Sequence, residues 1–148
     1  MRIELHATAF DPWAVLAQHV ATAAHLRGRG GALATFVGTM RDRNDGDHVQ
    51  GMRLEHYPGM TERELERIAG EAAARWPLLD VVLLHRFGEL QPDDPIVLVA
   101  VWSEHRAAAF DACRFIMEAL KSRAPFWKKE RLAHGERWVT TNTPGTAG

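Results

Sequence analysis

The order of hydrophobic patterns along the chain constrains the fold most, because stretches with helical spacing alternate with pairs of strand-like runs. The strand-like runs span residues 2–6, 32–39, 49–56, 81–84, 96–101 and 137–140. The stretches with helical spacing span residues 12–26, 61–76 and 103–121. The resulting order, β-α-β-β-α-β-β-α-β, favours an α+β fold with a mixed or antiparallel sheet over a doubly wound parallel sheet.

Local signals indicate where several of these elements begin. Asp11 and Pro12 supply an N-cap and a first-turn proline for the first helix, and Thr61 with Glu64 has the spacing of a capping box for the second. The charged stretch 40–47 is long for a hairpin connection between two strands. This length indicates a functional or mobile loop.

Size and charge limit the classes of protein to consider. At 148 residues with 46% hydrophobic content, the chain is predicted to form one domain at 1–140, with a flexible tail at 141–148. A formal net charge of −1 gives no overall attraction to nucleic acid, so anion binding requires a local cluster of cations. No apolar run approaches bilayer length and no signal peptide is recognisable, so we expect a cytoplasmic protein. The single cysteine, Cys113, lies in an apolar helical stripe and is expected to be a buried structural thiol.

The segment 120–131 carries the strongest functional signal, because it places five cations and one carboxylate around a proline followed by two aromatic residues. Pro125 should end the third helix and fold the chain back, so that Lys121 and Lys128 face one cavity. A lysine crowded by other cations in a partly dry pocket loses its proton more easily and can act as a base or nucleophile. The alternative is a solvent-exposed basic helix end. Lys129 is expected to be exposed or paired with Glu130.

Other basic residues are candidate ligands for an anion. His105 and Arg106 open the helix that leads to Lys121, where side chains and free amides can bind a phosphate together; the alternative is an ordinary helix start with a surface arginine. His85-Arg86 is a weaker candidate of the same kind. Arg41 follows the strand at 32–39 and is either a further anion ligand or one charged loop residue among several. No two histidines have the spacing of a metal site, so we predict no catalytic metal.

Five blocks between about residues 31 and 130 resemble, in order, the large, catalytic subunit of molybdopterin synthase. The blocks are FVGTMR at 36–41, LEHYPGM at 54–60, HRFGEL at 85–90, HRAAAF at 105–110 and LKSRAPFWKKE at 120–130. One departure is Asp93-Asp94-Pro95, where the family usually has glycine in the turn. The conformation of that turn is therefore an open question at this point.

The resemblance implies an α/β hammerhead with an additional antiparallel β subdomain. It also implies a sulfurtransferase that needs no cofactor and converts cyclic pyranopterin monophosphate to molybdopterin. Sulfur would arrive as a thiocarboxylate on the C-terminal Gly-Gly of a separate small, ubiquitin-like subunit. Two large subunits would form a homodimer at the centre of a heterotetramer, with the active site drawing on both copies.

The resemblance also implies roles for particular residues. Lys121 and Lys128 match the family's two active-site lysines. Arg41, His105 and Arg106 match residues of the anionic pterin-phosphate pocket, and Phe36 matches an aromatic residue of its wall. Two other functions remain open: a non-catalytic paralogue that binds the pterin or the small subunit, and a single-stranded nucleic-acid binder that stacks bases on Phe126 and Trp127.

Overall fold

The computed structural model describes residues 1–139, so the predicted tail at 141–148 lies outside the described residues. The elements follow the order β1 (Arg2–His6), α1 (Pro12–Thr22), η1 (Ala24–Leu26, a 3₁₀ turn), β2 (Ala32–Thr39), β3 (Arg43–Asn44), β4 (Asp47–His56), α2 (Met60–Arg75), β5 (Leu78–Arg86), β6 (Gly88–Leu90), β7 (Pro95–Ser103), α3 (Arg106–Arg123), β8 (Phe126–Leu132) and β9 (Gly135–Val139). Helices alternate with groups of strands as predicted, but β3 and β6 are additional, so that three strands and not two lie between successive helices.

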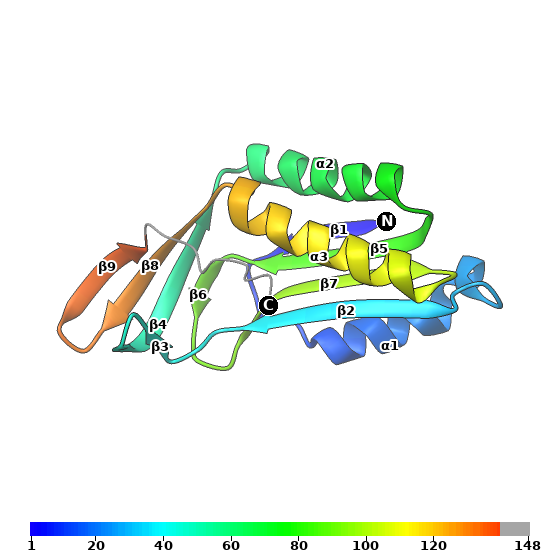
Figure 1. Ribbon diagram of the computed structural model, residues 1–148. Helices are drawn as coiled ribbons and strands as arrows, with labels where there is room; N and C mark the ends of the chain where they lie inside the picture. The colour runs from blue at the N-terminus through cyan, green and yellow to red at the C-terminus, as the bar shows by residue number, and fades with distance from the viewer. Residues whose placement is uncertain (140–148) are drawn as a thin grey trace.

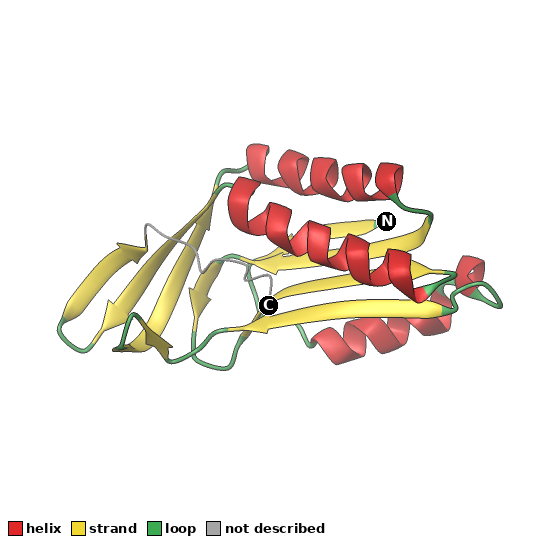
Figure 2. Ribbon diagram, in the orientation of Figure 1, coloured by secondary structure: helices red, strands yellow, loops and turns green. Residues whose placement is uncertain are grey.

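A four-stranded sheet with helices on both faces forms the larger part of the molecule (Figure 1). Its strand order is β1-β5-β7-β2; the β1–β5 pair is parallel and the other two pairs are antiparallel. Helices α2 and α3 cover one face and α1 covers the other (Figure 2). Alternate residues of β5 follow this division, since Leu83 packs beneath α2 and α3 while Leu84 packs on the side of α1.

A second, antiparallel sheet projects from one end of the first, at the left of Figure 1. Its strand order is β3-β4-β8-β9, and the short strand β6 also pairs with β4. The buried residues of a separate apolar cluster at this sheet are Met40, Val49, Met52, Leu54, Leu90 and Leu132. The predicted α+β class, with a mixed sheet and an antiparallel β subdomain, is thus confirmed.

Two local predictions were wrong. The first helix ends at Thr22, before the 3₁₀ turn, although its predicted N-cap is confirmed by Asp11 accepting from two backbone N–H groups. The charged stretch 40–47 is not simply a long loop, because β3 pairs with the start of β4 around Asp45 and Gly46, both with positive φ. The reversal predicted at Pro125 is confirmed, because α3 ends at Arg123 and strand β8 begins at Phe126.

The capping box predicted at Thr61 was also wrong. Helix α2 starts one residue earlier, and the Glu62 carboxylate accepts from the Gly59 N–H at the helix start. The Thr61 hydroxyl instead accepts from the Tyr57 N–H at 2.9 Å and donates to the Pro125 carbonyl at 3.1 Å. This buried side chain therefore ties the start of α2 to the turn between α3 and β8.

Asp93 stands in the turn where the family usually has glycine, and its backbone adopts the conformation that glycine favours there. Asp93 has a φ of 74°, in the left-handed region, and its backbone N–H donates to the Met40 carbonyl at 2.8 Å. Asp94 stabilises the same turn, because its carboxylate accepts from the Gln91 N–H at 2.8 Å. The turn between β6 and β7 is thereby held against the end of β2.

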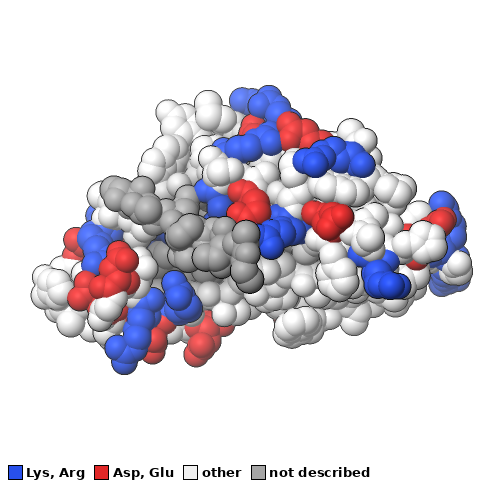
Figure 3. Space-filling model, in the orientation of Figure 1, with Lys and Arg blue, Asp and Glu red and all other residues white. Residues whose placement is uncertain are grey.

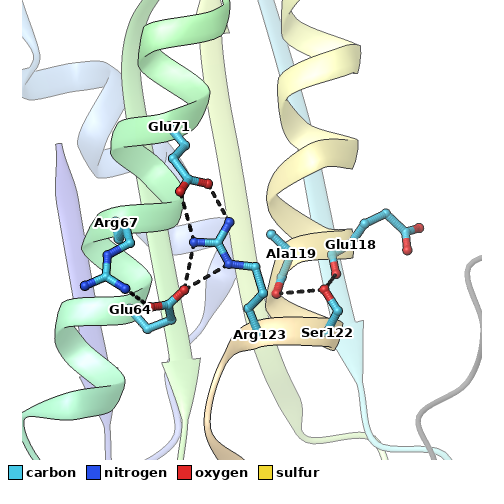
Figure 4. A network of polar contacts seen from close by, with 7 residues as sticks. All are labelled: Glu64, Arg67, Glu71, Glu118, Ala119, Ser122 and Arg123. Atoms are coloured by element: carbon cyan, nitrogen blue, oxygen red, sulfur yellow. Dashed lines mark hydrogen bonds and ion pairs between the residues drawn. The ribbon is translucent and has the colours of Figure 1, made fainter.

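The C-terminal end of α3 is anchored to α2 by Arg123 (Figure 4). Its guanidinium forms ion pairs with both Glu64 and Glu71 across the helix interface. Arg67 donates to the other oxygen of Glu64, at 2.9 Å. These contacts fix the last turn of α3, the part of that helix that carries Lys121.

Candidate active site

A cavity of about 430 Å³ lies where the two sheets meet, beside the last turns of α3. We call it the lysine cavity; its lining residues are Phe36, Gly38, Thr39, Arg41, His85, Ile96, Val97, Met117, Glu118, Leu120, Lys121, Ala124, Phe126 and Lys128. Most of its wall is apolar or aromatic, and three of its polar side chains are cations. A cavity of this composition suits a flat molecule that carries negative charge.

Pro125 brings the two lysines together, as the sequence predicted. Helix α3 ends at Arg123, and Ala124 has the extended backbone conformation favoured before proline. The chain then enters β8, which pairs antiparallel with β4 and places Lys128 opposite Leu54. Lys121 and Lys128 therefore reach the same cavity from two different elements.

The surroundings of Lys128 favour its neutral form. Burial, followed by the positive charge of Lys121, lowers the pKa of Lys128 to about 8, with a smaller contribution from Arg41. The Glu130 carboxylate acts in the opposite direction. Lys128 is therefore mostly protonated at neutral pH but loses its proton far more readily than an ordinary lysine, which suits a group that gives up and takes back a proton.

We expect the Lys128 signal to titrate near pH 8 in side-chain NMR of isotopically labelled lysines, assigned by comparison with Lys128→Arg. Because the Lys121 charge is one cause of the low pKa, Lys121→Met should raise the pKa of Lys128. Lys129→Met is the control, since Lys129 lies outside the cavity and pairs with Glu136. A Lys128 signal that titrates together with that of Lys129 would contradict this description of the site.

A smaller hollow of about 130 Å³ adjoins the lysine cavity and is more polar. Arg41, Lys121 and Lys128 line both spaces, and Arg43 adds a fourth cation to the smaller one. The two spaces differ in the rest of their lining, since the Phe36 and Phe126 rings bound only the larger one and the smaller one is mostly polar, with the Glu130 carboxylate in its wall. A ligand with a flat ring at one end and a phosphate at the other matches this division.

His85 belongs to the cavity more clearly than the sequence indicated. It is the penultimate residue of β5, and its ring stacks on Phe126 with the centroids 3.9 Å apart. Its neighbour Arg86 is buried and points elsewhere, donating to the carbonyls of Ala7 and Glu89. The sequence did show a histidine at the end of a buried strand. It could not show the stacking partner, which lies 41 residues further along the chain.

His105 and Arg106 do not reach the lysine cavity of their own chain. Both are exposed at the start of α3, whereas Lys121 lies at its other end. The 15 residues from Arg106 to Lys121 correspond to about 22 Å along a helix. Their predicted role as ligands of a phosphate therefore does not involve the lysine cavity of the same chain.

The charge distribution on the surface favours a small ligand. On the face shown in Figure 3, basic and acidic side chains are interspersed over the described residues. This pattern gives no support to the nucleic-acid-binding alternative, which requires a continuous basic track. Residues 1–139 contain no group of three metal-ligating side chains arranged around an ion. Within the same range, no helix has the length and apolar character needed to cross a membrane.

The chain is thus an α+β protein with a cation-lined, partly apolar pocket at the junction of its two sheets. Residues 6–123 match the family model described as MoaE protein. The chain belongs to the MoaE family, which confirms the resemblance found in its sequence blocks.

Individual relatives agree with this assignment. The chain is 56% identical, over 94% of its length and 90% of the other protein, to the molybdopterin synthase catalytic subunit of Pseudomonas aeruginosa. Among solved structures, the molybdopterin biosynthesis MoaE protein of Burkholderia ambifaria is 48% identical, with a TM-score of 0.75 over 93% of this chain and 88% of that one. The molybdopterin synthase structure from Staphylococcus aureus has a TM-score of 0.83 at 29% identity, over 95% of this chain and 98% of that one.

Proposed function

We propose that this chain is the catalytic subunit of a molybdopterin synthase. In this role it transfers sulfur from the C-terminal thiocarboxylate of a small, ubiquitin-like subunit to cyclic pyranopterin monophosphate. The observation that carries the proposal is the convergence of Lys121, Lys128 and Arg41 on one cavity with aromatic walls. Family membership and 56% identity to a molybdopterin synthase catalytic subunit support it.

The cavity suggests how the substrate binds. The flat pterin lies in the apolar part, between the side chains of Phe36 and Phe126. The phosphate lies towards the adjoining polar hollow, where Arg41 and the two lysines offer charge-assisted hydrogen bonds. The pterin side chain, which receives the sulfur, is then held next to Lys121 and Lys128.

The lysines take different roles in the reaction. The thiocarboxylate sulfur attacks a side-chain carbon of the substrate and displaces the oxygen bound to that carbon. The departing oxygen takes a proton from Lys128, and a thioester then joins the pterin to the small subunit. Water then attacks the acyl carbon, and cleavage of its C–S bond leaves sulfur on the pterin and a carboxylate on the small subunit. Lys121 as an ammonium stabilises the oxyanion of the tetrahedral intermediate, and neutral Lys128 accepts the proton of the attacking water. A second small subunit delivers the second sulfur.

In a dimer of this chain, His105 and Arg106 of one copy lie at the lysine cavity of the other copy. Strand β2 is an edge of its sheet, and Leu33 and Phe36 on it and Phe110 on α3 are exposed apolar side chains. Between β2 and α3 lies a groove of about 400 Å³ near the midpoint between Arg106 and Lys121. A two-fold axis at this groove would set the two α3 helices antiparallel, so that each start lies beside the other copy's Lys121.

This two-copy site predicts complementation between inactive variants. Lys121→Ala and Arg106→Ala should each lose the formation of dithiolene-containing pterin as homodimers. In a mixed dimer one of the two sites is intact, so random mixing after dissociation should restore about one quarter of the wild-type activity. Activity is measured with thiocarboxylated small subunit and cyclic pyranopterin monophosphate.

A matched mixture distinguishes a site shared between two copies from a general effect of mixing variants. Lys121→Ala mixed with Lys128→Ala should stay inactive, because these two residues belong to the same chain's cavity and each site then lacks one lysine. Restored activity in this control mixture would contradict the two-copy site. The two-copy site would also be contradicted if Lys121→Ala mixed with Arg106→Ala stayed inactive although subunit exchange had been verified. A wild-type chain that forms no dithiolene product would contradict the proposed function itself.

A further inference from the structure

His85 has a defined tautomer because its two ring nitrogens have different surroundings. Nδ1 lies 2.8 Å from the backbone carbonyl oxygen of Arg86. A carbonyl only accepts hydrogen bonds, so Nδ1 must carry the proton. The ring is held in place by this bond and by nearly parallel stacking on Phe126, with an interplanar angle of 15°.

The other ring nitrogen is consequently an acceptor that faces away from the Arg86 carbonyl. His85 lines the lysine cavity, and its Nε2 has no hydrogen-bond partner among residues 1–139. Burial, opposed by the bond to Arg86 and reinforced by the charges of Lys128 and Lys121, lowers the pKa of His85 to about 4. The ring therefore stays neutral at physiological pH and keeps its Nε2 lone pair available.

This acceptor differs from the other polar groups of the cavity. Arg41 and Lys121 are donors, and Lys128 is a donor as long as it carries its proton. The remaining side chains with an acceptor, Thr39 and Glu118, are both exposed to solvent. His85 is thus the uncharged acceptor in the more enclosed part of the wall, held with its ring stacked on one face of Phe126.

We infer that His85 is a specificity-determining residue whose Nε2 accepts a hydrogen bond from an N–H group of the bound pterin ring. The inference rests on the proposed function, because it takes the pterin as the ligand. The cations hold the phosphate, while His85 selects the edge of the heterocycle that enters the cavity. An analogue with an acceptor at that edge leaves two lone pairs facing each other and binds less well.

Three substitutions separate the hydrogen bond from simple packing. His85→Asn keeps a donor near the Nδ1 position and loses the acceptor in the cavity, whereas His85→Gln keeps an acceptor near the Nε2 position. His85→Phe keeps the flat ring against Phe126 and loses both nitrogens. We expect the Kd for cyclic pyranopterin monophosphate to rise about tenfold or more in the Asn and Phe variants, and by less than about threefold in the Gln variant.

The measurement is calorimetric titration of the dimeric chain with cyclic pyranopterin monophosphate and no small subunit, so that no turnover occurs. Normal binding by His85→Phe, or equal weakening by the Asn and Gln variants, would overturn the inference and leave only a packing role. Failure of the wild-type chain to bind the pterin would instead overturn the proposed function. Thermal unfolding of each variant identifies any that fail to fold.

A spectroscopic readout tests the same inference without substitution. In ¹⁵N NMR of labelled histidine, His85 should show a protonated Nδ1 and an unprotonated Nε2 in the free chain. Adding the pterin should shift the Nε2 resonance in the direction of an accepted hydrogen bond. An Nε2 signal that does not change at saturating pterin would overturn the inference.

Discussion

Lys121→Ala is expected to lower the single-turnover rate of sulfur transfer by about 10²–10⁴-fold, the range typical for loss of a positioned proton-transfer or charge-stabilising group. The side chain lies on the last turn of α3 and contributes its charge to the lysine cavity. Because Lys121 is exposed, its removal leaves the core intact and the fold should be preserved. The rate is followed as dithiolene-containing pterin by mass spectrometry after rapid quenching.

Lys129→Ala is the matched control for this prediction. Lys129 lies next to Lys128 on β8, but its Nζ is 2.9 Å from the Glu136 carboxylate and over the Trp138 ring. Lys129 was expected to be exposed or paired with Glu130; the pairing was wrong, because the neighbouring strand β9 supplies the partner. We expect Lys129→Ala to change the rate by less than about twofold. Similar losses in both variants would mean that overall charge, and not the lysine cavity, determines the rate.

Glu130→Ala is expected to lower the free energy of unfolding by about 2–3 kcal/mol, the largest stability effect that we predict. Glu130 is only 5% exposed, and its carboxylate accepts from Arg137 at 2.9 Å and from the Asn44 amide at 3.1 and 3.2 Å. These contacts join β8 to β9 and β3. The loss stays below that of a fully buried pair because Arg137 keeps its ion pair with Asp47.

Urea unfolding followed by circular dichroism measures this loss. Glu136→Ala is the control, because its side chain is 53% exposed and its pair with Lys129 is a surface ion pair worth less than about 1 kcal/mol. Glu130→Ala should also weaken catalysis, since Glu130 lies on the strand that carries Lys128 and lines the polar hollow. Equal stability of the two variants would show that the buried network does not hold the β subdomain together.

Local chemistry explains what the sequence predicted well. Pro125 cannot continue a helix, and the residue before it must be extended, so the reversal that brings Lys121 and Lys128 together is encoded within a few residues. The same holds for Asp11 and Pro12 at the start of α1. The family blocks added Phe36 and Arg41, which the structure also places at the cavity.

Long-range contacts explain what the sequence did not predict. Thr61 fits a capping pattern, but its hydroxyl is used by the Pro125 carbonyl, 64 residues away. Strand β6 has only three residues and exists because β4 pairs with it. The position of His85 depends on Phe126, and the separation of Arg106 from the lysines depends on the length of α3. None of these partners is visible in a local sequence window.

The most direct test of the proposed activity is a single-turnover reaction of this chain with thiocarboxylated small subunit and cyclic pyranopterin monophosphate. The predicted result is dithiolene-containing pterin only when all three components are present, with conversion of the small subunit to its carboxylate. A stable complex of the two proteins that forms no product would contradict catalysis and favour the non-catalytic binding alternative. Absence of any complex with its cognate small subunit would contradict the proposed partner as well.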